Sequence, residues 1–295
     1  MLDFFMFRFL IAILFTLFST ILFIEFKQSS INNIVYPTEV SFLSQDDNNI
    51  EFPLNFFSGA FLLLNKSESD EDSNATAFSV SSQNGYWLTA AHAVSGCWGV
   101  LIDQDGENYA FVDEVVLYEG ADIALLKTPI SSPSMVSLSR DSWVPKNGYV
   151  VGYSGNKINF ANAEVVGWTK AYDKNENYVF DVIVWKPDIL LDNNRTFGLS
   201  GSPIMDYDNN VVGVLVAIDE MGLFASVPTY FIDSILSNFN VDVKKLEVPV
   251  ESVKDLDFFA ENIAKFESSG SIKKIKCIRK PDQYIKDLAD SYTFK

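Results

Sequence analysis

The chain has 295 residues, 48% of them hydrophobic and 14% aromatic, which excludes a disordered protein and allows one large domain or two smaller ones. Its net charge of −17 disfavours a nucleic-acid partner, because such a partner needs a basic face against phosphate. Two cysteines and one histidine are too few for a disulfide scaffold or a His-rich metal site, so we expect neither a metal nor another cofactor.

An apolar run opens the chain. Residues 9–24 (FLIAILFTLFSTILFI) are apolar apart from small hydroxyls, and they lie between Arg8 and Lys27. A helix extended back to Phe4 is long enough to cross a bilayer core of about 30 Å. The pattern predicts an uncleaved signal anchor within residues 1–27; a cleaved signal peptide or a buried helix of a soluble protein are the alternatives. An anchor would leave the rest of the chain facing the periplasm or the exterior, and a cleaved signal would leave it secreted.

Residues 28–56 mix Asn, Ser and Asp with isolated apolar residues, and we interpret them as a linker or N-terminal extension. From residue 57 onward, short apolar or alternating runs are separated by polar turns, a pattern typical of β-strands. A Ser- and Pro-rich stretch at 129–145 divides the expected strands into two groups of six, so residues 57–240 predict an all-β fold of two similar subdomains. The expected strands are 57–64, 76–81, 85–90, 98–103, 109–118, 122–127, 148–153, 162–168, 178–185, 202–206, 211–218 and 222–227.

Two acidic stretches need an interpretation. Glu68, Asp70, Glu71 and Asp72 fall between expected strands and indicate a solvated loop rather than a calcium site. Residues 206–210 (DYDNN) begin like an EF-hand loop, but the sixth position is Val rather than Gly and the twelfth is Ala rather than Glu. We therefore expect a hairpin turn there.

The C-terminal part predicts a short helix at 228–239, with a proline near its start, and then a tail of unknown role at 241–295. Within the tail, apolar residues at helical spacing indicate an amphipathic helix: Leu256, Phe259, Ile263 and Phe266. A basic run at 273–280 is either a solvated surface strand or loop, or a contact for an anionic membrane surface or an acidic patch of the protein itself. Cys97 and Cys277 either form one disulfide in an oxidising compartment or remain separate thiols.

The single histidine, His92, lies in the run Tyr86–Val94, and a serine flanked by glycines follows about a hundred residues later in Gly198-Leu199-Ser200-Gly201. A serine hydroxyl is a poor nucleophile until a base takes its proton, and histidine, with an unperturbed pKa of about 6.5, suits that task. If a histidine acts as general base in this chain, it is His92.

Three motifs in chain order carry a resemblance: Thr89-Ala90-Ala91-His92, Asp122-Ile123-Ala124-Leu125-Leu126 and Gly198-Leu199-Ser200-Gly201-Ser202-Pro203. Together they resemble the trypsin-like (chymotrypsin-fold) serine protease superfamily. The segment Thr76–Val80 before Asn84–Thr89 is more similar to the bacterial Deg/HtrA-like and glutamyl-endopeptidase-like branches. The resemblance covers about residues 57–239 and implies two six-stranded antiparallel β-barrels with the active site between them. Residues 241–295 are too few for a PDZ domain.

The resemblance also implies roles for single residues. Ser200 would be the nucleophile, His92 the general base and Asp122 the residue that orients the imidazole. The N–H groups of Gly198 and Ser200 would form the oxyanion hole.

The substrate backbone would pair with the edge of residues 214–218, and the specificity pocket would be lined near Asn194, Val216, Ala217 and Ile218. With neither an obvious acid at the pocket base nor a second histidine, we expect a small or apolar P1 residue. Leu199 stands where digestive members often carry an acid, and Ser202 stands where a glycine is common.

The expected function is therefore a serine endopeptidase acting on proteins or peptides, held to a membrane by its N-terminal helix. The sequence gives no indication of the oligomeric state. A catalytically silent binding or scaffold protein of the same fold, or an esterase using the same triad, are the alternatives.

Overall fold

The computed structural model describes residues 61–64, 71–81, 85–130, 132, 137–138, 144–173, 178–188, 197–219, 221–241, 264–281 and 285–286. The predicted signal anchor at 1–27 and the linker at 28–56 lie outside the described residues. Among the residues that are described, no helix is both long enough and apolar enough to cross a membrane.

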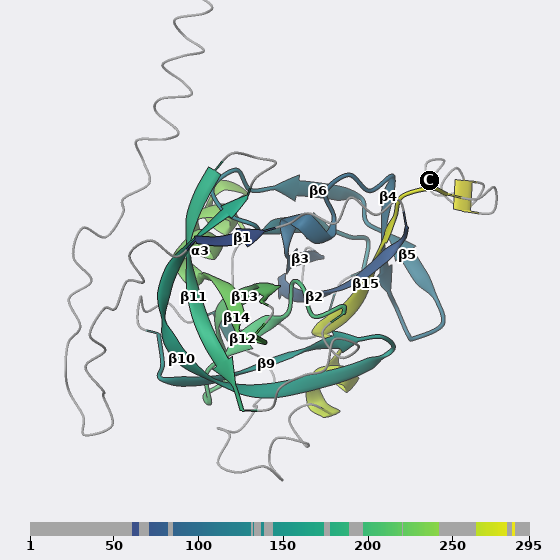
Figure 1. Cartoon of the computed structure of the whole chain (residues 1–295). Helices are drawn as coiled ribbons and strands as arrows, with labels where there is room; N and C mark the ends of the chain where they lie inside the picture. The colour runs from purple at the N-terminus through teal and green to yellow at the C-terminus, as the bar shows by residue number, and fades with distance from the viewer. Residues whose placement is uncertain are drawn as a thin grey trace, which may run out of the picture. The chain divides into compact units, whose positions relative to one another are not determined.

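Two curved β-sheets make up the described protein (Figure 1). The first sheet has seven strands in the spatial order β5-β4-β15-β2-β3-β7-β6. Its strands are β2 (Ser73–Ser81), β3 (Tyr86–Thr89), β4 (Gly99–Asp103), β5 (Tyr109–Phe111), β6 (Glu114–Leu117), β7 (Ala124–Lys127) and β15 (Ile272–Ile278).

The second sheet closes into a six-stranded antiparallel barrel, because β9 pairs with both β10 and β12. The barrel order is β9-β10-β11-β14-β13-β12, and β1 and β8 add to it as parallel strands on β10 and β13. Its strands are β1 (Phe61–Leu64), β8 (Ser137–Leu138), β9 (Asn147–Ser154), β10 (Lys157–Asp173), β11 (Tyr178–Pro187), β12 (Pro203–Met205), β13 (Asn210–Ile218) and β14 (Phe224–Pro228).

The predicted all-β fold of two barrel-like sheets is confirmed, but only the second sheet is a closed six-stranded barrel; the first, with seven strands, is a half-barrel. The helical elements are few. Among the described residues they are the 3₁₀ turn η1 (Ala91–Ala93), the helix α3 (Thr229–Asn238) and helical stretches at 264–269 and 285–286. The helix α3 occupies the predicted span and begins directly after Pro228, whose fixed φ and missing N–H suit a helix start. The expected hairpin turn at 206–210 is also present, and the Asp206 carboxylate accepts the N–H groups of Asp208 and Asn210 at 2.9 and 2.8 Å.

One hydrophobic cluster runs through both sheets. Val80 and Trp87 belong to the first sheet, and Val151 and Val214 belong to the second. Phe231 of α3 joins the same cluster and packs its ring edge-on against Phe180 of β11, with the ring centroids 6.4 Å apart. A smaller cluster fills the second barrel and includes Val150, Trp185, Leu199, Ile204 and Leu215. Because the two sheets share one packed core, their relative position is fixed. A site built from residues of both sheets requires such a fixed position.

One expected strand belongs to the other sheet. The run 57–64 precedes the first group in sequence, yet its described part, β1, pairs with β10 of the second sheet. β15 instead completes the first sheet. It comes from the C-terminal tail, for which the sequence predicted no role. Alternating hydrophobicity fixes which face of a strand is buried, but not which distant strand it pairs with.

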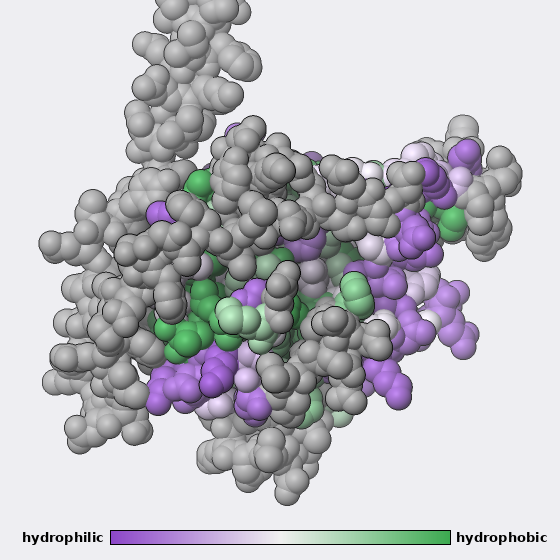
Figure 2. All heavy atoms as spheres, viewed as in Figure 1, coloured by the Kyte–Doolittle hydropathy of each residue, from purple (hydrophilic) through white to green (hydrophobic). Residues whose placement is uncertain are grey.

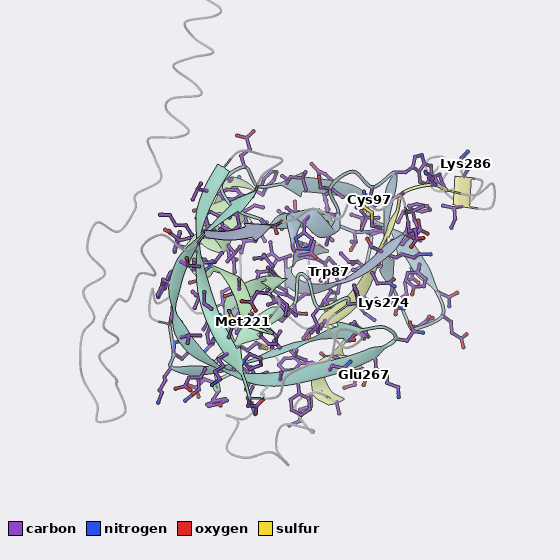
Figure 3. All side chains as sticks on the ribbon, viewed as in Figure 1. Trp87, Cys97, Met221, Glu267, Lys274 and Lys286 are labelled. Atoms are coloured by element: carbon purple, nitrogen blue, oxygen red, sulfur yellow. A yellow bond between two sulfur atoms is a disulfide. The ribbon has the colours of Figure 1, made fainter. Side chains whose placement is uncertain are left out.

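The basic run of the tail forms β15, between β2 and β4 (yellow in Figure 1). Its apolar residues are buried, and the ammonium of Lys276 lies 3.2 Å from the carboxylate of Asp72. Lys274, labelled in Figure 3, is also buried. Its ammonium donates to the side-chain oxygen of Asn156 at 2.9 Å. Thus the run is a core strand whose lysines meet polar groups of the protein itself.

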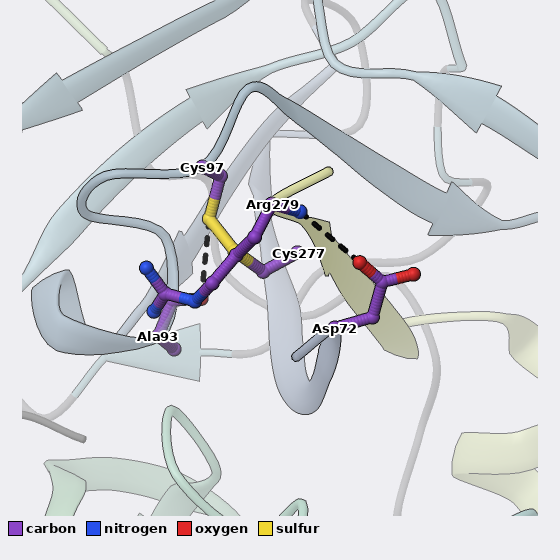
Figure 4. The surroundings of a disulfide bond; sticks show 5 residues. All are labelled: Asp72, Ala93, Cys97, Cys277 and Arg279. Carbon is purple, nitrogen blue, oxygen red and sulfur yellow. Dashed lines mark hydrogen bonds between the residues drawn. A yellow bond between two sulfur atoms is a disulfide. The ribbon is translucent and has the colours of Figure 1, made fainter. Parts of the chain in front are cut away.

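A disulfide joins Cys97 to Cys277, with the Cα atoms 5.4 Å apart (Figure 4). The bond ties β15 to the loop that follows η1. Next to it, the N–H of Arg279 donates to Asp72 at 3.1 Å. Of the two alternatives that the sequence left open for the cysteines, the disulfide is the one present.

Candidate active site

Strand pairing brings His92 and Asp122 together. β3 ends at Thr89, three residues before His92, and β7 begins at Ala124, two residues after Asp122. The strands are antiparallel neighbours in which Thr89 lies opposite Ala124, so the end of one strand meets the start of the other. The N–H of Ala91 also donates to the backbone carbonyl of Asp122 at 3.3 Å, which holds η1 against this corner.

Ser200 comes from the second sheet, in the turn that leads into β12. Gly198 and Gly201 on either side have φ values of +99° and +85°, which residues with a side chain rarely adopt. A Cβ on Gly201 would also lie 2.2 Å from the backbone oxygen of Thr76. Leu199, where digestive relatives often carry an acid, is buried in the core of the second barrel and anchors the turn there.

The three predicted side chains lie in one hydrogen-bonded row. Nδ1 of His92 lies 2.6 Å from Oδ2 of Asp122, and Nε2 lies 3.0 Å from Oγ of Ser200. The other carboxylate oxygen of Asp122 accepts the backbone N–H of His92 at 2.8 Å. The Asp122 side chain is 2% exposed and that of His92 is 29% exposed, so the row runs from the core toward solvent.

Two backbone donors lie at the serine. Among the described residues, no group accepts a hydrogen bond from the N–H of Gly198 or of Ser200. The neighbouring N–H groups of Gly201 and Ser202 are engaged with the carbonyls of Leu215 and Leu199 at 2.8 and 2.9 Å. Gly198 and Ser200 are the residues that the resemblance implies for an oxyanion hole. Their backbone N–H groups are therefore available to donate hydrogen bonds to a ligand.

The residues expected to bind substrate lie on β13, apart from Asn194, which lies outside the described residues. β12 pairs with β13 only as far as Val214, so the stretch from Val216 to Ile218 extends past the end of β12. Hydrophobic residues gather over β13 and β14 on the face seen in Figure 2, and Met221, labelled in Figure 3, lies in this region. Met221 and Phe197, the latter next to Gly198, are 71% and 72% exposed.

Sequence reasoning did not single out Thr76 as a site residue, although its hydroxyl donates to the carbonyl of Gly198 at 2.8 Å. The two residues are far apart in sequence, and no local pattern signals their contact. Across the ranges that the structure describes, no group of three or more His, Cys, Asp or Glu side chains is placed to hold a metal ion.

Comparison with known proteins bears on the whole arrangement. Residues 75–214 match the family model of the trypsin-like peptidase domain, a span that includes His92, Asp122 and Ser200. No curated protein matches the chain significantly.

Several solved structures are similar to this chain. The active form of the Rv3671c protease from M. tuberculosis is 18% identical, with a TM-score of 0.45, over 59% of this chain and 82% of that one. The HtrA-type protease AlgW with a decapeptide is 18% identical, with a TM-score of 0.44, over 64% of this chain and 58% of that one. A human pathogenic astrovirus serine protease is 16% identical, with a TM-score of 0.38, over 53% of this chain and 88% of that one. The family match and the two barrel-like sheets agree with each other: residues 75–214 are similar to a trypsin-like peptidase domain, and the fold has the architecture of a chymotrypsin-fold serine protease.

Proposed function

We propose that this protein is a serine endopeptidase in which His92, Asp122 and Ser200 act as a catalytic triad. The observation that carries the proposal is the continuous row from the Asp122 carboxylate through the His92 ring to the Ser200 hydroxyl, at 2.6 and 3.0 Å. Because an ionised carboxylate only accepts hydrogen bonds, Nδ1 is the donor toward Asp122 and Nε2 is left to accept the serine proton.

In the proposed reaction, Oγ of Ser200 attacks the scissile carbonyl carbon while Nε2 of His92 takes the hydroxyl proton. The carbonyl oxygen becomes an oxyanion, which the N–H groups of Gly198 and Ser200 stabilise. His92 then gives its proton to the leaving amine, and the acyl chain stays on Ser200. A water molecule, deprotonated by His92, releases the acid and restores the enzyme.

We further propose that an extended peptide adds to the edge of β13 at residues 216–218, with its side chains beside an apolar surface. The support is the end of β12 at Val214 and the exposed side chains of Phe197 and Met221. An unpaired strand edge offers backbone hydrogen bonds to any peptide, while the side-chain surroundings provide selectivity. Cleavage after small or apolar residues is the expected preference.

The disulfide supports a location outside the cytoplasm, where such bonds persist. With the apolar run at 9–24, it favours an envelope protein whose peptidase domain faces the periplasm or the exterior, held by an uncleaved anchor. Reactive free thiols in the protein as isolated from its source would contradict this location.

The proposed nucleophile is tested with a fluorophosphonate probe and a diverse peptide library on the full chain. The wild type should be labelled and cleave peptides, whereas Ser200→Ala should not be labelled and should lose about 10⁴- to 10⁶-fold in kcat. Ser202→Ala is the matched control, because this neighbouring hydroxyl is buried and has no partner among the described residues.

Equal labelling of the wild type and Ser200→Ala would contradict the nucleophile. An unlabelled wild type that cleaves no peptide would instead indicate a silent binding protein. Turnover of esters but not of peptides would indicate an esterase.

A further inference from the structure

Thr76 lies fully buried where the first sheet meets the turn that carries Ser200. It belongs to β2, yet its backbone N–H and its hydroxyl make three hydrogen bonds to the second sheet and the serine turn. Its backbone N–H donates to the carbonyl of Ser200 at 2.9 Å, and its hydroxyl donates to the carbonyl of Gly198 at 2.8 Å. The same hydroxyl accepts the backbone N–H of Tyr153 at 2.9 Å.

These bonds hold the carbonyls of Gly198 and Ser200, the two residues whose N–H groups have no acceptor among the described residues. An oxyanion hole works only if both donors are aimed at one point about 2.7–3.1 Å away. Each peptide unit is planar, so fixing a carbonyl fixes the orientation of the plane that follows the residue. By binding the carbonyls of Gly198 and Ser200, Thr76 fixes the peptide planes on both sides of the Leu199–Ser200 peptide, which carries the N–H of Ser200. The first of these planes also adjoins the peptide that carries the N–H of Gly198, so the bonds limit how far either donor can turn.

The turn needs such a restraint because of its glycine. At φ +99°, Gly198 lacks the side chain that would limit rotation of its peptide units. Only the hydroxyl of Thr76 is recorded as a partner of its carbonyl within the described residues. The hydroxyl therefore provides the restraint that backbone stiffness does not.

Thr76 is itself held in place by its neighbours in the first sheet. Its carbonyl accepts the hydroxyl of Thr89 at 2.7 Å, and Thr89 ends the strand that leads to His92. Its other neighbour is β15, where Lys274 lies opposite Thr76. One buried network thus extends from the strand before the base to the turn of the nucleophile.

We propose that Thr76 is a positioning residue that sets the oxyanion hole through its hydroxyl. This inference rests on the proposed peptidase function. It implies that the hydroxyl contributes to stabilising the transition state and little to binding the substrate, because it touches the turn and not the β13 edge.

The test compares Thr76→Val, which keeps the shape and removes the hydroxyl, with Thr76→Ser, which keeps the hydroxyl. For a peptide cleaved by the wild type, Thr76→Val should lower kcat by about 10- to 10³-fold, the range for loss of up to one oxyanion donor, with KM within about threefold. A peptide aldehyde, whose adduct carries the oxyanion, should bind more weakly by a similar factor. The corresponding peptide acid should bind as before, and Thr76→Ser should stay within about threefold of the wild type in every measurement.

A folded Thr76→Val with wild-type kcat would overturn the inference, and so would a rise in KM alone or a Thr76→Ser as slow as Thr76→Val. If Thr76→Val does not fold, Thr76→Ala replaces it under the same criteria; if neither folds, the residue is structural and the positioning role is wrong. Failure of the proposed function looks different, because the wild type itself would then be inactive toward both the probe and the peptides.

Discussion

At the residue scale, Gly152 and Ser202 form a complementary pair beside the site. A Cβ on Gly152 would lie 1.8 Å from Oγ of Ser202 and 2.9 Å from its Cβ. Ser202 stands where a glycine is common in related proteases, so the space for its side chain comes from the glycine on β9.

Gly152→Ala should therefore destabilise the protein by about 1–3 kcal/mol, because the added methyl group overpacks a buried contact. The Ser202→Gly background removes the two closest contacts and leaves the Thr76 hydroxyl at 3.0 Å from the added methyl group, so the same change should cost less there. Denaturant unfolding of the wild type, both single variants and the double variant measures this coupling. Equal costs of Gly152→Ala in the two backgrounds would show that the two positions do not interact.

The sequence could indicate the residues of the proposed triad because each stands in a recognisable local motif, and folding places their side chains in one row. It could not indicate Thr76, whose bond to Gly198 spans 122 positions and depends on how the two sheets meet. The contact between Gly152 and Ser202 could not be predicted for the same reason. The sequence indicates that Ser202 stands where a glycine is common, but not that its partner is Gly152 on another strand.

At the element scale, the strands could be predicted from their hydrophobic alternation, and their partners could not. β15 has the pattern of a strand, Ile-Lys-Lys-Ile-Lys-Cys-Ile, but its lysines equally suit a solvated surface segment. Its place between β2 and β4 depends on chain segments about 170–200 residues away. β1 is the opposite case: its position along the sequence was predicted correctly, but it pairs with a strand of the second sheet and not of the first.

Since β15 is central to the first sheet, its disulfide should contribute strongly to stability. The bond between Cys97 and Cys277 closes a loop of 180 residues, and restricting so long a loop in the unfolded chain stabilises the fold by about 2–5 kcal/mol. We expect the Cys97→Ala/Cys277→Ala variant to lose about this much in urea unfolding. Reductant should lower the stability of the wild type and leave the variant unchanged; equal sensitivity of both proteins to reductant would contradict the prediction.

At the scale of the whole molecule, a common core joins the two sheets, and the chain carries a large negative net charge. The net charge of −17 already opposes compaction through self-repulsion, so any further loss of protons in the folded state would add to it. Buried tyrosines oppose that loss. Burial raises the pKa of Tyr149 on β9, and burial, with Glu267 and Asp103 nearby, raises the pKa of Tyr153 to about 12.

These raised pKa values predict a loss of stability at alkaline pH. Between about pH 10, where tyrosines of the unfolded chain release their protons, and about pH 12, the folded protein binds more protons than the unfolded one. The contribution is therefore fully present below about pH 10 and is lost as the pH rises toward 12. Tyr153→Phe should leave the unfolding free energy at pH 8 nearly unchanged, because the Tyr153 hydroxyl makes no hydrogen bond among the described residues. Between pH 10 and 11.5, the unfolding free energy of the variant should fall less steeply than that of the wild type. Urea unfolding across this pH range measures the slope, and identical slopes for the two proteins would refute the assignment to Tyr153.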